Sequence, residues 1–251
     1  MTPRIIIAAC VWMIFSVFCP AASVTIDPFG TPDGTLITNS GFQSGATFSN
    51  DPADSVGGVR SMFVDVVNPP GIFDFVRAEL TAGTLRYSSS PNGYGYLGLL
   101  YGFSQSLALN LSDNFAANDS FVFTFSTALS APISMLLQIG AENSTKATAS
   151  VTILSGITTY VLPLASLTRD GAGNPKAPQF DPSKVATIFP NLSVTTPGVT
   201  YSLDSIAIVP EPSTATLVVI GMCVVTLGRC RPFVTHTNAA SNSCGKAATC
   251  S

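Results

Sequence analysis

The stretch Phe121-Val122-Phe123-Thr124-Phe125 places three phenylalanines at alternate positions. Successive side chains of a β-strand point to opposite faces of the sheet, so the three rings share one face. Phenylalanine is among the residues most often found inside folded domains. The segment therefore predicts a β-strand whose phenylalanine face is buried.

Short segments of alternating polarity, rich in Val, Ile, Phe, Tyr and Thr, continue this pattern through the middle of the chain. Turn sequences such as Pro91-Asn92-Gly93 and residues 170–175 separate them. No segment shows a sustained helical stripe, although Asp181 before Pro182 predicts one short helix with an aspartate N-cap. About ten short strands predict an all-β fold, a single β-sandwich or barrel. The predicted strands are 59–67, 84–88, 94–101, 106–111, 120–127, 133–139, 147–154, 158–164, 185–188 and 201–208.

The composition of the middle limits its chemistry. The chain of 251 residues has one histidine and six cysteines, and all of these lie outside residues 24–208. A Ser-His-Asp triad, a Cys-His pair or a zinc site of His and Cys cannot be assembled there. No phosphate-binding glycine loop or dinucleotide fingerprint is present. We therefore expect no enzyme, and the remaining alternative is a carboxylate-dependent glycoside hydrolase.

The charge of the middle also excludes partners. Between Val24 and Val209, 13 acidic residues stand against 7 basic residues, which gives a net charge of −6. An acidic domain without a basic stripe argues against nucleic acid as a partner and against docking on anionic lipid. Its charge mainly serves solubility.

The N-terminal segment has the features of a secretory signal peptide. Arg4 is followed by the largely apolar run 5–18 and then by small residues around Ala22. A basic start, a short apolar run and a small-residue exit define such leaders, and the run is shorter than the roughly 20 residues of a membrane span. We assign residues 1–23 to a signal-peptide helix, with an uncleaved membrane anchor as the alternative.

The C-terminal segment combines a Pro-Glu-Pro sequence, an apolar run and two arginines. The run 214–228 has a helical character but would span only about 22 Å at 1.5 Å per residue, short of the roughly 30 Å hydrocarbon core. Arg229 and Arg231 would stay on the cytoplasmic side. Such a short transmembrane helix can hold a protein in the membrane for a limited time while an enzyme acts on it.

This order of features resembles the PEP-CTERM sorting signal of bacterial proteins, here residues 209–231. The resemblance implies an exosortase-type membrane protease as partner, a transient inner-membrane stage, and delivery to the cell surface or the extracellular polysaccharide matrix. The tail 232–251 departs from the family pattern, because members of the family end soon after the basic cluster. We expect this tail to be disordered. The tail is either a discarded cytoplasmic stub or a misassigned end. The sorting motif comprises Pro210, Glu211, Pro212, Arg229 and Arg231.

The middle resembles galactose-binding-like jelly rolls, whose architecture is related to that of carbohydrate-binding modules. The landmarks are Val56-Gly57-Gly58-Val59-Arg60, Leu85-Arg86-Tyr87-Ser88, Gly98-Leu99-Leu100-Tyr101-Gly102 and Leu203-Asp204-Ser205-Ile206. The resemblance implies a jelly-roll sandwich over residues 24–208. It supports a fold and not an activity.

Two candidate sites follow. Tyr94 and Tyr96, beside a Pro-Asn-Gly turn, could stack on sugar rings, and the alternative is that they pack into the sheet. The jelly-roll resemblance implies a structural calcium, for which Asp204 with Asp27 or Asp33 offers oxygen ligands. The alternative is that Asp204 is exposed or caps a turn.

The sequence thus predicts an exported, non-enzymatic protein of the cell surface or matrix, associated with exopolysaccharide. The alternative is a carbohydrate-binding module proper.

Overall fold

The computed structural model describes residues 23–30, 34–39, 44–49, 55–67, 74–81, 83–102 and 105–210. Residues 1–22 of the predicted leader 1–23, residues 211–231 of the predicted sorting segment 209–231 and the tail 232–251 lie outside these ranges. No helix among the described residues is both long enough and apolar enough to cross a membrane. The predicted transmembrane helix 214–228 is not among the described residues.

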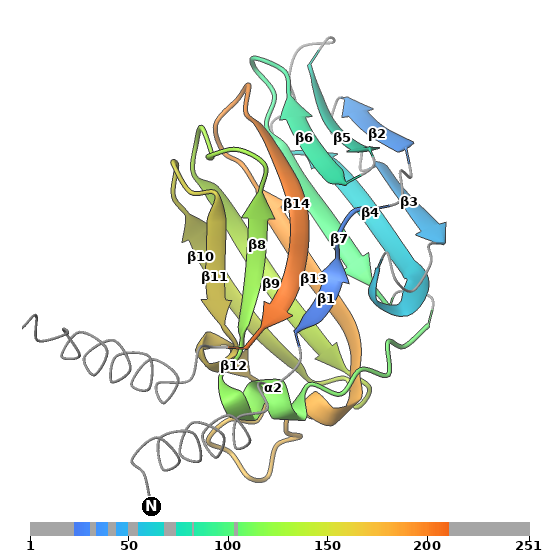
Figure 1. Ribbon diagram of the computed structural model, residues 1–251, viewed down its shortest axis with the longest axis vertical. Coiled ribbons are helices and arrows are strands. Elements are labelled where there is room, and N and C mark those ends of the chain that lie inside the picture. Colours follow the sequence, from blue (N-terminus) through green and yellow to red (C-terminus); the bar gives the residue numbers. More distant parts are fainter. Residues whose placement is uncertain are drawn as a thin grey trace, which may run out of the picture. The chain divides into compact units, whose positions relative to one another are not determined.

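Two seven-stranded sheets pack face to face as a β-sandwich within the described residues (Figure 1). The first sheet has the order β11-β8-β14-β6-β5-β2, with β1 also pairing with β14, and the second has the order β12-β10-β9-β13-β7-β4-β3. Adjacent strands run antiparallel, and the chain passes repeatedly between the two sheets. The predicted all-β sandwich is confirmed. The strands are β1 (Val24–Asp27), β2 (Gly34–Asn39), β3 (Ser44–Ser49), β4 (Val59–Val66), β5 (Phe75–Thr81), β6 (Thr84–Ser89), β7 (Gly95–Tyr101), β8 (Ser120–Phe125), β9 (Ile133–Ala141), β10 (Lys146–Ile153), β11 (Thr159–Pro163), β12 (Thr168–Arg169), β13 (Val185–Ser193) and β14 (Thr200–Val209).

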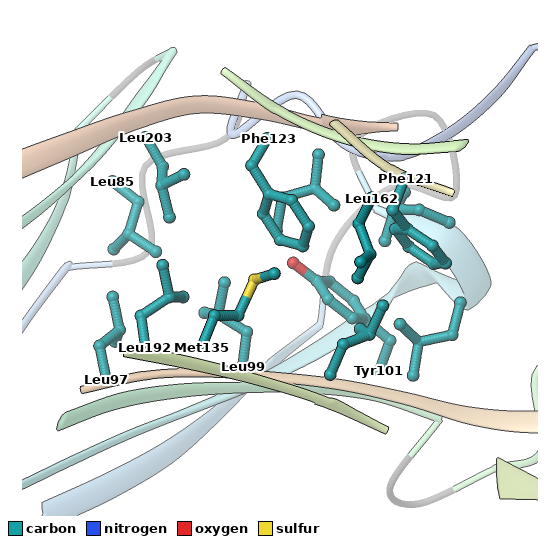
Figure 2. Packing of buried hydrophobic residues seen from close by; sticks show 14 of the residues in the cluster. Leu85, Leu97, Leu99, Tyr101, Phe121, Phe123, Met135, Leu162, Leu192 and Leu203 are labelled. Atoms are coloured by element: carbon teal, nitrogen blue, oxygen red, sulfur yellow. The ribbon is translucent and has the colours of Figure 1, made fainter. Parts of the chain in front are cut away.

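The hydrophobic core lies between the two sheets. Phe121, Phe123 and Phe125 of β8 are 0%, 0% and 3% exposed, so the prediction from their alternate spacing is confirmed. Burial of such side chains is the main stabilising term of a sandwich. Figure 2 shows the first sheet contributing Leu85, Phe121, Phe123, Leu162 and Leu203, which face Leu97, Leu99, Tyr101, Met135 and Leu192 of the second sheet.

The prediction of a strand at 106–111 was wrong. Only an isolated bridge between Leu109 and Val185 forms there, because Ala108 has a left-handed backbone, with φ of 48°, that interrupts the extended chain. The chain then enters a short helix that the sequence did not predict, α2 (Ser112–Ala117). This helix lies at one end of the sandwich (Figure 1). Every other predicted strand is present, with ends that differ by a few residues.

In the part of the chain that the structure describes, three one-turn 3₁₀ helices join strands: η1 (Val56–Gly58), η2 (Leu164–Ser166) and η3 (Pro182–Lys184). The last confirms the short helix predicted after Asp181. The Asp181 carboxylate accepts a hydrogen bond from the Ser183 backbone N–H at 3.0 Å. The Ser183 hydroxyl donates a second bond to the same carboxylate oxygen at 2.6 Å. This hydroxyl bond first, and the backbone bond after it, hold the pKa of Asp181 below its ordinary value.

A candidate ligand-binding face on the second sheet

The middle of the outer face of the second sheet is formed by alternate residues of β4, β7, β13 and β9, with β3 beyond β4 and β10 beyond β9. The inward residues of these strands are buried and most of the outward ones are partly exposed. Because the strands pair in register, their outward side chains form rows across the sheet. One row runs from Phe63 to Gly98, then to Asn191 and to Leu136.

A groove lies where this row crosses β7, because Gly98 carries no side chain. A Cβ atom at Gly98 would lie 3.1 Å from Cε2 of Phe189 and 3.7 Å from Cδ2 of Phe63. The two rings therefore border the bare backbone of β7 from either side. The hollow has a volume of about 270 Å³ and is lined by Phe63, Leu100, Gln138, Thr187 and Phe189. We call it the Phe63–Phe189 groove.

Uncharged polar groups accompany the two rings. Gln138 is paired with Phe189 across the β9–β13 ladder, and Thr187 is paired with Gly140. A Cβ atom at Gly140 would lie 2.5 Å from Oγ1 of Thr187, so the hydroxyl occupies the space above this second glycine. The groove thus combines aromatic surface with amide and hydroxyl groups, the combination found in many small-molecule sites.

Tyr96 lies on the same face, one row from Gly98, whereas Tyr94 packs against the hydrophobic core. The Tyr96 hydroxyl donates a hydrogen bond to Oδ2 of Asp65 at 3.1 Å, and these residues are directly opposite each other on β7 and β4. The structure therefore places one of the two predicted stacking tyrosines beside the groove and leaves the other away from it.

Asp27, one of the predicted calcium ligands, is fully buried and points into the sandwich. Its Oδ2 accepts hydrogen bonds from Arg60 at 2.5 Å and from the Tyr101 hydroxyl at 2.8 Å, and its Oδ1 accepts from the Phe29 N–H at 2.8 Å. Burial raises the pKa of Asp27 above its ordinary value, while the adjacent Arg60 opposes the rise. The pKa of the Tyr101 hydroxyl is well above its ordinary value because it is buried beside this carboxylate.

Asp204 lies on β14 and accepts hydrogen bonds from Ser126 and, at 3.4 Å, from Thr84. No described contact joins it to Asp27, and Asp33 lies outside the described residues. Within the described ranges, no three His, Cys, Asp or Glu side chains gather where they could hold a metal ion. The structural calcium stays a prediction.

The sequence did not identify Phe63, Phe189, Gln138 or Asn191 as site residues. Each belongs to a strand that was predicted at least in part, but their proximity depends on which strands pair. The stretch from Phe189 to Ser193 was also not recognised as strand, because Pro190 interrupts it. The one available signal was Gly98 within an otherwise bulky strand, since such a glycine often marks a close approach.

No carboxylate lines the groove, and Asp65 stands one row away from Phe63. A glycoside hydrolase needs two carboxyl groups facing the scissile bond. The groove by itself does not offer that pair.

No family model matches the chain, and no curated protein matches it. Solved structures to which it is similar include carbohydrate-binding modules of cellulosomal cellulases of Clostridium thermocellum. For a family 11 module the identity is 12%, the TM-score 0.37, and the match covers 76% of this chain and 95% of that chain. For a family 30 module the identity is 16% and the TM-score 0.39, and the match covers 76% of this chain and 99% of that chain.

An agarase is also similar, with 13% identity and a TM-score of 0.42, but the match spans 76% of this chain and only 25% of that enzyme. Likenesses this weak add no argument about the function of this chain.

Proposed function

We propose that this protein binds a carbohydrate chain in the Phe63–Phe189 groove and does not act on it chemically. The observation that carries the proposal is the groove itself, two phenyl rings beside bare backbone with amide and hydroxyl groups around them. A sugar ring has an apolar C–H face and a rim of hydroxyls. Aromatic rings provide apolar contact area for the face, and polar side chains orient the rim.

The position of the groove supports a long ligand. It lies on the outer face of a sheet, where β4, β7, β13 and β9 are neighbours. Neighbouring strands are about 4.8 Å apart, so a row of outward side chains across four strands extends over roughly 14 Å. The row of Asp65, Tyr96, Ser193 and Ser134 crosses the same four strands beside it. An extended polymer suits such a surface better than a single small molecule.

The proposal is tested by replacing Phe189 with alanine. We expect binding to weaken by about threefold to tenfold, because an aromatic contact of this kind contributes roughly 0.5–1.5 kcal/mol. Affinity electrophoresis in gels containing a panel of soluble polysaccharides measures the effect. The matched control is Val161→Ala in β11, which removes an apolar side chain that is 51% exposed on the other sheet. If no polysaccharide retards the unaltered protein, the proposed function is wrong, and equal effects of both variants would remove the site assignment.

We further propose that the chain is exported and sorted by its PEP-CTERM-like segment to the cell surface or the extracellular matrix, with an exosortase-type protease as partner. Support comes from the residue order at both termini. The strand bounds are compatible with it: β1 begins at Val24, just after the predicted leader, and β14 ends at Val209, just before Pro210. Cleavage at either place would leave the sandwich intact.

Intact mass spectrometry of protein recovered from the outer surface tests this second proposal. We expect a species that begins near Ser23 or Val24 and lacks the residues after the Pro-Glu-Pro motif. The same mass would show any group attached at the new end. Recovery of the whole 251-residue chain from the cytoplasmic fraction would contradict export and sorting together.

A further inference from the structure

We propose that the Phe63–Phe189 groove selects neutral glycans over acidic ones and that Asp65 is the side chain that sets this selectivity. The proposal rests on the carbohydrate-binding function above and narrows it to one class of ligand.

Asp65 is placed to contact a ligand that occupies the groove. It follows Phe63 by two residues on β4, so both side chains are on the outer face in adjacent rows. Asp65 lies opposite Tyr96, which is two residues from Gly98 on β7 just as Asp65 is two residues from Phe63 on β4. The hydrogen bond from the Tyr96 hydroxyl to Oδ2 holds the carboxylate in position.

No cation offsets Asp65 on the four strands that form the groove. Their described sequences contain two charged residues, Arg60 and Asp65. Arg60 points inward and is paired with Asp27 in the core. Asp65 is therefore the outward-facing charge on these four strands. The next cation on the outer face is the exposed Lys146 of β10, which is paired with Gly140 in the row of Thr187 and lies three rows from Asp65.

This arrangement affects neutral and acidic sugars in opposite ways. An ionised carboxylate is purely an acceptor with about four lone-pair sites, so it can take hydrogen bonds from sugar hydroxyls besides the one from Tyr96. Bonds to an ionised acceptor are stronger than those between neutral groups. A uronate or sulfate group beside Asp65 would meet a like charge, and the four strands of the groove carry no outward cation to relieve the repulsion.

The test compares neutral and carboxylated polysaccharides of one backbone. Hydroxyethyl cellulose and carboxymethyl cellulose form one pair, and galactomannan with alginate or polygalacturonate widens the panel. We expect the unaltered protein to bind neutral members at least about tenfold more tightly, a difference that falls as salt screens the open face. Equal or tighter binding of the acidic members would overturn the inference while leaving carbohydrate binding intact. Absence of binding to every member would overturn the proposed function instead.

Asp65→Asn tests the assigned residue, since its amide oxygen can still accept the bond from Tyr96. We expect binding of acidic polysaccharides to rise severalfold and binding of neutral ones to weaken. The matched control is Asp113→Asn, which removes the same charge from an exposed position in α2. If the two variants behave alike, Asp65 does not set the selectivity. A change in net charge would affect both variants equally, so that comparison separates a local effect from a general one.

Discussion

Replacement of Arg60 by methionine is expected to lower the free energy of unfolding by about 3–5 kcal/mol, because it leaves the Asp27 carboxylate buried without its counter-charge. Both side chains are fully buried, and the pair links β1 to β4. Asp27 also holds the turn after β1, where Phe29 has a left-handed backbone, with φ of 54°. Equilibrium unfolding in urea would measure the loss.

The loss should depend on pH in a defined direction. In the variant, the hydrogen bonds from Phe29 and Tyr101 would still oppose the effect of burial, but the charge of Arg60 would be gone, so the folded-state pKa of Asp27 would rise further above 3.8. A group with a raised folded-state pKa contributes stability below its unfolded value and loses it as the pH rises through the folded value. The variant should therefore be least stable at neutral pH and should recover part of its stability as the pH falls toward about 4.

Two controls distinguish the ion pair from loss of packing. Arg77→Met removes an arginine whose side chain is 38% exposed and paired with Glu79 at 3.0 Å, and we expect a change of at most about 1 kcal/mol. The double variant Asp27→Asn/Arg60→Met removes both charges. The amide oxygen of Asn can still accept from the Phe29 N–H, and the amide NH2 in the place of Oδ2 can donate to the Tyr101 hydroxyl oxygen. The double variant should recover much of the stability that Arg60→Met loses. A double variant no more stable than Arg60→Met would show that the aliphatic stem of Arg60 matters more than its charge.

Gly98→Val is expected to weaken polysaccharide binding by more than about tenfold, or roughly 1.4 kcal/mol, while the sandwich stays folded. The new side chain would point outward between the two rings, where even a Cβ atom lies 3.1 Å from Phe189. The rings of Phe63 and Phe189 would have to move, and the valine side chain would fill the space above the backbone of β7. The effect should exceed that of Phe189→Ala, because the substitution disturbs both borders of the groove at once.

The matched control is Ser88→Val in β6, which adds comparable volume to a partly exposed outward position on the first sheet, away from the groove. We expect its binding to be unchanged. Affinity electrophoresis measures binding, and far-ultraviolet circular dichroism checks the fold. Undiminished binding by a folded Gly98→Val protein would mean that the ligand lies elsewhere.

The class of fold was predictable because alternation is a local property. Phe121, Phe123 and Phe125 indicate a buried strand face without reference to any other segment. The strands that were not predicted have weaker alternation or lower β-propensity in their sequences. The strand β5 alternates correctly, but its inward Ala78 and outward Glu79 have low β-propensity. The helix α2 has six residues, too few to show a helical stripe.

The candidate site was less predictable because it depends on strand pairing. Gly98 and Asn191 are far apart in sequence and become neighbours only because β7 pairs with β13. Nothing local in either segment specifies that partner. Tyr94 and Tyr96 have the spacing of residues on one strand face, yet β7 begins at Gly95, and Tyr94 packs on the core instead.

The pairing of β1 with β14 has a consequence for how the domain can be displayed. Val24 lies opposite Ile208, so the chain enters and leaves the sandwich side by side, both on the first sheet. The groove opens on the outer surface of the second sheet. A domain tethered through either end would therefore keep that surface unobstructed, and a fluorescent label fused at one end would report on bound polymer without competing for it.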